Sequence, residues 1–431
     1  MSKVWIKNGS FITMAAGQEH VINGHMLVVD GVIAYIGEQE PHNAEQAEIV
    51  EGKGLLFMPG LINTHGHAAM TLLRGYSDDQ TLQVWLQEKM WPMEAKYVDA
   101  DTRAGSDLAI AEMLLSGTTT FVDMYDRMDQ VAQASVDAGI RAFLTRGVIG
   151  LCPPDVQTAK LDEAVAFAKQ WNGAGDGRVR TMLSPHAPYT CPPDYIERIV
   201  AAAHELDLPL HTHMSETKAE VQQNVDDYGK RPVAHLDELG FFSRPALLAH
   251  AVHLTDEEID LLAARGASIS HNPISNLKLG SGVARVPDLL AKGVKLSLGT
   301  DGVASNNNLD LFQEIRAAAL LHKGVYGDPT AVPAYTALQL GTSLGAQAIW
   351  HEHIGSLEVG KAADFIAINI DQPHFFPRTD LVSHLVYSAN GRDVQHVWVA
   401  GKQLVKNREL LTLDEEKIRY EAQAAFERLL K

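Results

Sequence analysis

Side chains suited to binding one metal ion occur in four short segments of this 431-residue chain. The segments are PGLINTHGH with His65 and His67, HTHMSET with His213 and Glu216, LLAHAVH with His250, and LSLGTDG with Asp301. Each segment ends an apolar, β-rich run. Imidazole and carboxylate groups bind divalent ions, and such an ion makes a water molecule acidic enough to react near neutral pH. The residue types therefore predict a metal-dependent hydrolase.

The spacing of His65 and His67 places both imidazoles on one face of a strand, because strand side chains alternate. This H-x-H pattern is weak alone, since 19 histidines in the chain produce about one such pair by chance. We favour His65 and His67 because they follow PGLINT and precede a Gly-rich turn. We interpret a second pair, His351-x-His353, as solvated surface residues in a helix-like segment.

His213 and Glu216 lie three residues apart at the end of one run. We interpret His213 as a metal ligand and Glu216 as the acid and base that moves protons during the reaction. The alternatives for Glu216 are a metal ligand or a negative charge that caps the N-terminus of the helix predicted over TKAEVQQNV. His211 shares a face with His213, and we expect it to be buried, either supporting a ligand or packing in the core.

Asp301 precedes Gly302 at the end of another run, where its carboxylate could bind the ion and accept a proton. An Asx turn is the alternative, and the three histidines favour the functional interpretation. His250 and His253 point to different faces, so one of them is expected to face the site. The run TMLSPHAPY offers no lysine to bridge a second metal, so one ion is expected.

Eight apolar, β-rich runs alternate with segments of helical periodicity. They are Leu55–His67, Thr118–Tyr125, Ile140–Val148, Val179–Ala187, Leu208–Glu216, Ala246–Leu254, Ala267–Ser275 and Lys295–Gly302. This alternation predicts an α/β fold with parallel strands, and eight units predict a closed (β/α)8 TIM barrel. Because the carboxyl ends of barrel strands meet at one mouth, the metal-binding segments are expected to converge there. An open doubly wound sheet would more often carry a Gly-rich phosphate loop, and none is present.

Both ends of the chain are β-rich and contain Asn-Gly or Asp-Gly turn signals or similar short turns. We therefore predict a small β-sandwich plus a C-terminal helix from residues 1–57 and 358–431, and the catalytic barrel from residues 58–357. The helix is predicted over LDEEKIRYEAQAAFERLLK, and its exposed face suggests a homo-oligomer.

The net charge of −18 argues against nucleic acid and anionic membranes as partners. Two cysteines, Cys152 and Cys191, fit free thiols in a reducing compartment better than a disulfide. The segment MSKVWIKNGSFITM has no long apolar region, and no run of eighteen apolar residues occurs. A cytoplasmic protein is expected.

The segments PGLINTHGH, TRG, SPHAPYTC, HTHMSET, AHAVHL, SHNPISNLKLGSG and LGTDGVASNNNLDLF resemble the amidohydrolase superfamily. Within it they are similar to the 5′-methylthioadenosine/S-adenosylhomocysteine deaminases of the ATZ/TRZ-like chlorohydrolase branch. The resemblance spans residues 1–410. It implies deamination of methylthioadenosine, S-adenosylhomocysteine or adenosine to the inosine derivative and ammonia, with one divalent ion per subunit, usually Zn²⁺.

The resemblance also implies roles for individual residues. The metal ligands correspond to His65, His67, His213 and Asp301. The catalytic residues correspond to Glu216, which protonates adenine N1, His250, which orients the attacking hydroxide, and Asp301. The substrate-binding residues correspond to Glu94, Arg146 and His186, together with Glu216 and Asp301. Glu94 would bind the ribose hydroxyls, and Arg146 would lie near the 5′ end of the substrate.

The chain departs from some relatives in one position. They carry a second arginine after the third strand, suited to an amino-acid carboxylate, whereas the nearest residue here is Lys160, after a longer loop containing CPPDVQ. Lysine lacks the two-pronged guanidinium that binds a carboxylate, so binding of S-adenosylhomocysteine should be weaker here. Methylthioadenosine has no carboxylate, and its binding should be unaffected. The segment VWLQEKMWPM, with Trp85 and Trp91, is expected either to wall the pocket or to pack as a helix on the barrel.

Two other functions remain as alternatives. A guanine deaminase or a triazine or melamine hydrolase would share the fold and the metal site. Its substrate has no ribose, however, so Glu94 would have no substrate hydroxyls to bind. An inactive scaffold would lack metal ligands, and all of them are present here. Imidazole and carboxylate ligands also suit Fe, Mn or Ni.

Overall fold

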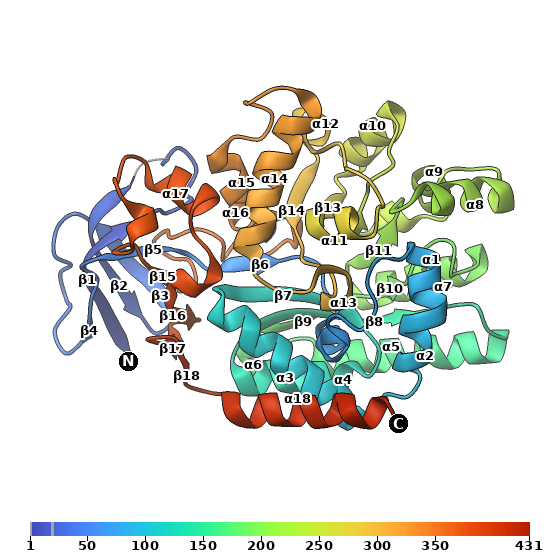
Figure 1. Ribbon diagram of the computed structural model, residues 1–431, viewed down its shortest axis with the longest axis horizontal. Coiled ribbons are helices and arrows are strands. Elements are labelled where there is room, and N and C mark those ends of the chain that lie inside the picture. The colour runs from blue at the N-terminus through green and yellow to red at the C-terminus, as the bar shows by residue number, and fades with distance from the viewer. Residues whose placement is uncertain (1, 19–20) are drawn as a thin grey trace.

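The computed structural model describes residues 2–18 and 21–431 and contains one mixed sheet and two parallel sheets (Figure 1). The mixed sheet is built from both ends of the chain, with strand order β18-β17-β16-β15-β5-β1-β2-β3 and β4 beside β1. Its strands are β1 (Lys3–Phe11), β2 (Ile22–Val29), β3 (Val32–Gly37), β4 (Glu48–Glu51), β5 (Leu55–Pro59), β15 (Phe365–Asn369), β16 (Val394–Val399), β17 (Lys402–Lys406) and β18 (Glu409–Leu410). Because β5 pairs with both β1 and β15, the two terminal segments are held in one sheet.

The two parallel sheets have the orders β10-β8-β7-β6, with β9 beside β8, and β11-β12-β13-β14. Their strands are β6 (Leu61–Asn63), β7 (Thr118–Tyr125), β8 (Arg141–Val148), β9 (Val179–Thr181), β10 (Ser184–Pro185), β11 (Leu210–Met214), β12 (Ala246–His250), β13 (Ser268–His271) and β14 (Lys295–Leu298). Hydrogen bonds join these sheets at both edges. The amide of His211 donates to the carbonyl of Leu183 (3.0 Å), and the amide of Thr64 donates to that of Leu298 (2.9 Å).

The predicted run Leu55–His67 is two strands rather than one. β5 ends at Pro59 in the mixed sheet, and β6 begins at Leu61 in a parallel sheet. A Cβ on the intervening Gly60 would lie 2.0 Å from Oγ1 of Thr119, so the chain can cross between the sheets here only with glycine. The flanking residues are all apolar and buried, which hid this break from the sequence pattern. The run Val179–Ala187 likewise forms two short strands, β9 and β10.

Helices connect the parallel strands and surround them (Figure 1). The helical segments are η1 (Ala68–Leu73), α1 (Leu82–Val84), η2 (Trp85–Met90), α2 (Trp91–Glu94), α3 (Asp99–Leu115), α4 (Met128–Ala138), α5 (Pro154–Trp171), α6 (Ala174–Gly177), α7 (Pro193–Leu206), α8 (Lys218–Tyr228), α9 (Pro232–Glu238), η3 (Phe241–Ser243), α10 (Asp256–Arg265), α11 (Pro273–Lys278), α12 (Val286–Ala291), α13 (Val303–Asn306), α14 (Leu311–Tyr326), α15 (Ala334–Leu340), α16 (Ser343–Ala348), η4 (Pro373–Phe375), α17 (Leu381–Tyr387), η5 (Gly391–Asp393) and α18 (Glu415–Leu429). In α7, Ile196, Ile199 and Val200 are buried, as the three- and four-residue spacing predicts.

The C-terminal helix predicted from the sequence is confirmed as α18. It lies against α3 along the lower edge of Figure 1, where Arg428 forms an ion pair with Asp101. Within the described residues, no helix has the length and apolar character needed to cross a membrane. Cys152 and Cys191 are both free thiols.

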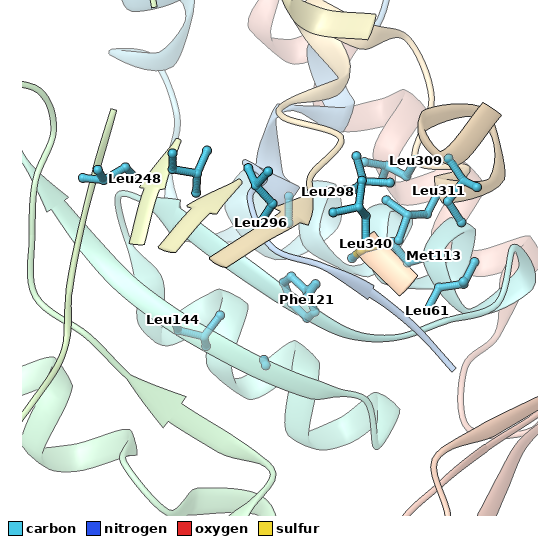
Figure 2. Close-up of a cluster of buried hydrophobic side chains, with 14 of the residues drawn as sticks. Leu61, Met113, Phe121, Leu144, Leu248, Leu296, Leu298, Leu309, Leu311 and Leu340 are labelled. Carbon is cyan, nitrogen blue, oxygen red and sulfur yellow. The ribbon is translucent and has the colours of Figure 1, made fainter. Parts of the chain in front are cut away.

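The largest hydrophobic core lies between the parallel strands and their helices (Figure 2). Leu144 of β8, Leu248 of β12 and Leu298 of β14 belong to it, together with Leu340 of α15. Burial of such side chains contributes roughly 1.5–3 kcal/mol each, so this core fixes the strand ends where polar residues gather.

Candidate metal centre and active site

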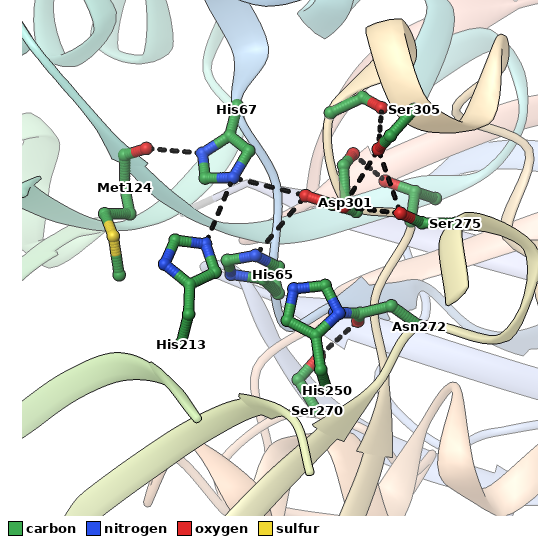
Figure 3. Close-up of polar contacts among 12 residues, drawn as sticks. His65, His67, Met124, His213, His250, Ser270, Asn272, Ser275, Asp301 and Ser305 are labelled. Atoms are coloured by element: carbon green, nitrogen blue, oxygen red, sulfur yellow. Dashed lines mark hydrogen bonds and ion pairs between the residues drawn. The ribbon is translucent and has the colours of Figure 1, made fainter. Parts of the chain in front are cut away.

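The four predicted metal-binding segments lie together at the carboxyl ends of the parallel strands (Figure 3). Oδ1 of Asp301 lies 3.2 Å from Nε2 of His67 and 3.4 Å from Nε2 of His65. Nε2 of His213 is 3.4 Å from Nε2 of His67. Ligand atoms of His65, His67 and His213 lie within 4.8 Å of one another, as do those of His65, His250 and Asp301. This spacing suits a single ion.

His65 and His67 do not lie on a strand, so that part of the prediction is wrong. β6 ends at Asn63, and the histidines follow in a loop. The loop is held from two sides, because the amide of Asp301 donates to the His65 carbonyl (3.0 Å) and the amide of Met124 to the Gly66 carbonyl (3.2 Å). The convergence of the two imidazoles therefore comes from these contacts and not from strand alternation.

Each of the four histidines uses Nδ1 for a hydrogen bond within the protein. The partners are His211 Nε2 for His65 (3.0 Å), the Met124 carbonyl for His67 (2.6 Å), the His186 carbonyl for His213 (2.7 Å) and Asn276 Oδ1 for His250 (2.8 Å). Nε2 of His65 is buried and makes no hydrogen bond with any residue in the described ranges. A buried nitrogen without a partner, surrounded by imidazoles and a carboxylate, fits a bound cation.

Asp301 is oriented by two serine hydroxyls that the sequence analysis did not identify. Oγ of Ser275 donates to Oδ2 of Asp301 (2.6 Å), and Oγ of Ser305 donates to the same oxygen (2.9 Å). Oδ1 is thereby turned toward the histidines (Figure 3). Both serines lie near predicted strand ends, in SHNPISN and TDGVAS, but a serine there is too common to be diagnostic.

The charges of the cluster complement a cation. Burial holds the pKa of His65 and of His213 well below 6.5, so both are neutral bases. Burial also opposes the charged form of His67, but the carboxylates of Asp301 and Asp123 raise its pKa to about 9. Burial opposes the charged form of Asp301, but the neighbouring imidazoles of His65 and His67 hold its pKa well below 3.8. The Asp301 carboxylate that favours the protonated form of His67 would also attract a positively charged metal ion.

Glu216 and His250 face each other beside this cluster. Oε2 of Glu216 lies 3.7 Å from Nε2 of His250, and both side chains are buried. Burial raises the pKa of Glu216, which favours the protonated form that an acid needs. The side chain of Thr217, and not that of Glu216, caps helix α8, so the helix-capping interpretation of Glu216 is wrong.

One cavity of about 300 Å³ adjoins the predicted metal-binding cluster, which consists of His65, His67, His213, His250 and Asp301. The predicted substrate-binding residues all line it: Glu94, Arg146, His186, Glu216 and Asp301. Trp85, Leu86 and Trp91 line it as well, which confirms the pocket-wall interpretation of VWLQEKMWPM. The volume suits a small organic molecule.

Polar contacts fix two of the cavity residues. The hydroxyl of Tyr125 donates to Oε1 of Glu94 (2.5 Å), a partner that the sequence gave no reason to single out. Arg146 is paired with Asp126 (3.1 Å) and Glu163 (3.0 Å). Burial lowers the pKa of His186 to about 3, so its imidazole is neutral.

Lys160 also lines this cavity, and its Nζ donates to the carbonyl of Ile149 (3.1 Å). It belongs to α5, which begins at Pro154. The segment CPPDVQ therefore starts a helix and is not the long loop predicted, because proline is well tolerated in the first helical turn.

Three further histidines that the sequence singled out, His253, His351 and His353, lie outside the site. His253 points away from the site and its Nε2 contacts the carbonyl of Ser281 (2.7 Å), so His250 is the one that faces the mouth, as expected. His351 and His353 follow α16 rather than lying in a helix. His351 is half-buried against Phe143, with ring centroids 5.6 Å apart, and only His353 is exposed.

Comparison with known proteins gives consistent matches. The model of the Amidohydrolase family matches residues 56–404. A 5-methylthioadenosine/S-adenosylhomocysteine deaminase of Halalkalibacterium halodurans is 50% identical over 98% of both chains. A 5′-deoxyadenosine deaminase of Methanosarcina acetivorans is 47% identical over 100% of this chain and 99% of its own. The crystal structure of an adenosine deaminase from Xanthomonas campestris with bound zinc is 37% identical, with a TM-score of 0.92 over 100% of this chain and 99% of that one.

Proposed function

Because this chain belongs to the amidohydrolase family, we propose that it is a hydrolytic deaminase of adenine nucleosides. Its substrates are methylthioadenosine and S-adenosylhomocysteine, which it converts to the inosine derivatives and ammonia. Full-length relatives named as deaminases of such nucleosides support the reaction. The observation that carries the proposal is one cavity that joins the His/Asp cluster to Glu94, Arg146 and His186.

The proposal includes a single metal site formed by His65, His67, His213 and Asp301. Zn²⁺ is the ion we propose, since the Xanthomonas campestris structure contains it. When bound, it supplies a Lewis acid that makes water acidic near pH 7. The unpartnered Nε2 of His65 and the low pKa of Asp301 support these ligands.

The protein's own side chains move the protons. Asp301 accepts a proton from the attacking water while Nε2 of His250 orients its oxygen toward C6 of the adenine. Glu216, whose pKa is raised by burial, donates a proton to N1 of the ring. The C6–N bond then breaks as the C6 hydroxyl becomes a carbonyl and returns its proton to Glu216, and the amino group leaves as ammonia with the proton that Asp301 accepted from water. Each acid–base step of this kind contributes about 10²–10⁴-fold in rate.

The rest of the cavity would hold the nucleoside. Glu94 would accept hydrogen bonds from the ribose hydroxyls, His186 would contact the base, and Arg146 would lie toward the 5′ substituent. The apolar side chains of Trp85 and Leu86 would cover a thioether. The two free cysteines support the reducing, cytoplasmic setting that we propose for the enzyme.

We also propose the architecture that carries the site. The two parallel sheets form one closed (β/α)8 barrel over residues 58–357, supported by the hydrogen bonds at both sheet edges. Residues 1–57 and 358–431 form a β-sandwich and the terminal helix. A separate buried cluster with Phe11, Phe57, Phe365 and Trp398, drawn from both terminal segments, supports this division.

A guanine deaminase or a triazine or melamine hydrolase is the alternative on the same frame. It is less well supported, because the nearly full-length relatives at 47–50% identity are named as nucleoside deaminases. It would also leave Glu94 without a substrate partner.

A turnover panel on the zinc-loaded protein tests the proposal. The ultraviolet change from adenine to hypoxanthine, together with ammonia release, would be followed with methylthioadenosine, S-adenosylhomocysteine, adenosine, guanine and melamine. Preference for the thio-nucleosides is expected. Turnover of guanine or melamine alone would overturn the substrate assignment, and a protein that binds no stoichiometric metal would contradict the hydrolase itself.

A further inference from the structure

A Thr-x-x-Glu segment begins two of the helices, α8 and α10, but its glutamate acts differently in each. In α10, Thr255 and Glu258 form an ordinary capping box: Oγ1 of Thr255 accepts from the Glu258 amide (3.3 Å), and Oε2 of Glu258 accepts from the Thr255 amide (2.9 Å). In α8, Oγ1 of Thr217 likewise accepts from the amide of Glu220 (3.1 Å). The Glu220 carboxylate, however, does not bind the Thr217 amide.

The Glu220 carboxylate reaches further back along the chain. Its Oε1 accepts from the amide of Ser215 (2.9 Å), and its Oε2 accepts from the amide of Glu216 (2.7 Å). Glu220 is 3% exposed, so these two hydrogen bonds are formed away from water. Burial raises the pKa of Glu220 to about 7, while the two amide hydrogen bonds favour its charged form. The carboxylate thus holds two consecutive amides, one of which belongs to Glu216.

The turn held by Glu220 has a strained backbone and contacts the next strand end. Ser215 has φ of 51°, in the left-handed region that residues with a Cβ rarely adopt. Its carbonyl accepts from the amides of Val252 (3.1 Å) and His253 (3.0 Å). The amide of Ala251, next to His250, donates to the carbonyl of Met214 (3.0 Å). The turn therefore links the backbone of Glu216 to that of His250.

We propose that Glu220 is a positioning residue that holds the Ser215–Glu216 backbone so that the Glu216 carboxyl stays beside Nε2 of His250. The inference rests on the proposed role of Glu216 in proton transfer. A backbone turn that a non-glycine residue disfavours persists only where surrounding contacts impose it, and the two bonds from Glu220 supply that constraint. A small displacement of an acid or base can lower the rate by about 100-fold, so a group that touches no substrate can control kcat.

The test compares Glu220→Gln with Glu258→Gln, which removes the buried carboxylate of the ordinary capping box and its ion pair with Arg231. kcat, KM and zinc content would be measured on both zinc-loaded variants. Amide hydrogen exchange of the peptide spanning residues 214–217 would be measured without substrate. For Glu220→Gln we expect kcat about 10- to 100-fold lower, KM within about threefold, one ion per chain and faster exchange at the amides of Ser215 and Glu216. Glu258→Gln should keep kcat and that exchange within about twofold while lowering the melting temperature.

A kcat near that of the wild type in folded Glu220→Gln, or slow exchange at the two amides, would overturn the inference. If Glu220→Gln does not fold, Glu220→Asp replaces it, because the shorter carboxylate keeps the charge but cannot reach both amides. The same fall in kcat is then expected, and wild-type kcat again contradicts it. A wild-type protein inactive on every nucleoside would instead reject the proposed function, while the exchange measurement would still decide whether Glu220 holds the turn.

Discussion

Nε2 of His211 lies 3.0 Å from Nδ1 of His65, while Nδ1 of His211 lies 2.8 Å from the carbonyl oxygen of Leu247. Because a carbonyl can only accept, Nδ1 of His211 carries the hydrogen. Burial lowers the pKa of His211 to about 4, so the ring is neutral and its Nε2 is an acceptor. His65 must then donate from Nδ1, which leaves the lone pair of its own Nε2 directed at the metal-binding cluster. His211 thus supports a predicted ligand, one of the two alternatives left open by the sequence.

Replacing His211 with alanine should weaken metal binding without removing a ligand. We expect the affinity for Zn²⁺ to fall about 10- to 100-fold, the usual effect of losing a group that orients a ligating histidine. Competition with a chromophoric chelator would measure it. His353→Ala changes the other H-x-H pair at an exposed position and should leave the affinity unchanged. Equal affinities in wild type and His211→Ala would show that His65 needs no such support.

Glu216→Gln should separate proton transfer from metal binding. The amide keeps the shape of the side chain but cannot cycle a proton, so kcat is expected to fall by about 10²–10⁴-fold. Zinc content should remain one per chain, because the carboxylate of Glu216 is not among the clustered ligand atoms. Activity above a tenth of the wild-type value would reject the proton-transfer role.

The sequence predicted well which residues would lie together, because each lies at or just after the end of a strand, and parallel strands carry their carboxyl ends to one edge. This reasoning brought His213, His250 and Asp301 together although 88 residues separate the first from the last. It failed for the detailed placement of His65 and His67, because β6 ends at Asn63 and the loop after it is held by the amides of Met124 and Asp301. The break at Gly60 was missed because it depends on the close approach of Thr119. A steric contact between segments distant in sequence leaves no periodic signal.

The supporting residues were missed for a related reason. Ser275, Ser305 and Tyr125 act through single hydrogen bonds to Asp301 or Glu94, and their types are common at strand and helix ends. Glu220 carried a recognisable capping pattern, but that pattern predicts a bond to the Thr217 amide rather than to Ser215 and Glu216. Local patterns identify which group can bond, and the tertiary fold decides its partner.

Lys160→Ala should distinguish the two thio-nucleosides. Arg146 already has two carboxylate partners, whereas Nζ of Lys160 contacts one carbonyl among the described residues and lines the same cavity. A single, partly solvated ion pair is worth up to about 1 kcal/mol, so kcat/KM for S-adenosylhomocysteine should fall about fivefold. Methylthioadenosine lacks the carboxylate and serves as the internal control, with a change below about twofold. A parallel loss for both substrates would place Lys160 in the structure of the cavity instead.

Glu314 offers a test of stability against pH. It is fully buried on α14, where Nδ2 of Asn306 donates to its Oε1 (2.6 Å) and the Ile274 amide donates to its Oε2 (3.2 Å). Burial raises its pKa from 4.5 to about 8, because those hydrogen bonds do not replace the lost hydration. Between these two values the folded protein keeps a proton that the unfolded chain has released. Rising pH therefore lowers the free energy of unfolding across this interval.

Glu314→Gln replaces the titrating carboxyl with an amide, so comparison with the wild type isolates the contribution of Glu314 to the pH dependence of the free energy of unfolding. Relative to the wild type, the variant's free energy of unfolding should increase by up to about 1.4 kcal/mol per pH unit between pH 4.5 and 8, and level off above pH 8. Urea unfolding of both proteins at matched pH and equal zinc content would measure the difference. Titrations common to the two proteins cancel in this difference, so a constant offset from pH 5 to 8 would mean that Glu314 is ionised in the folded protein.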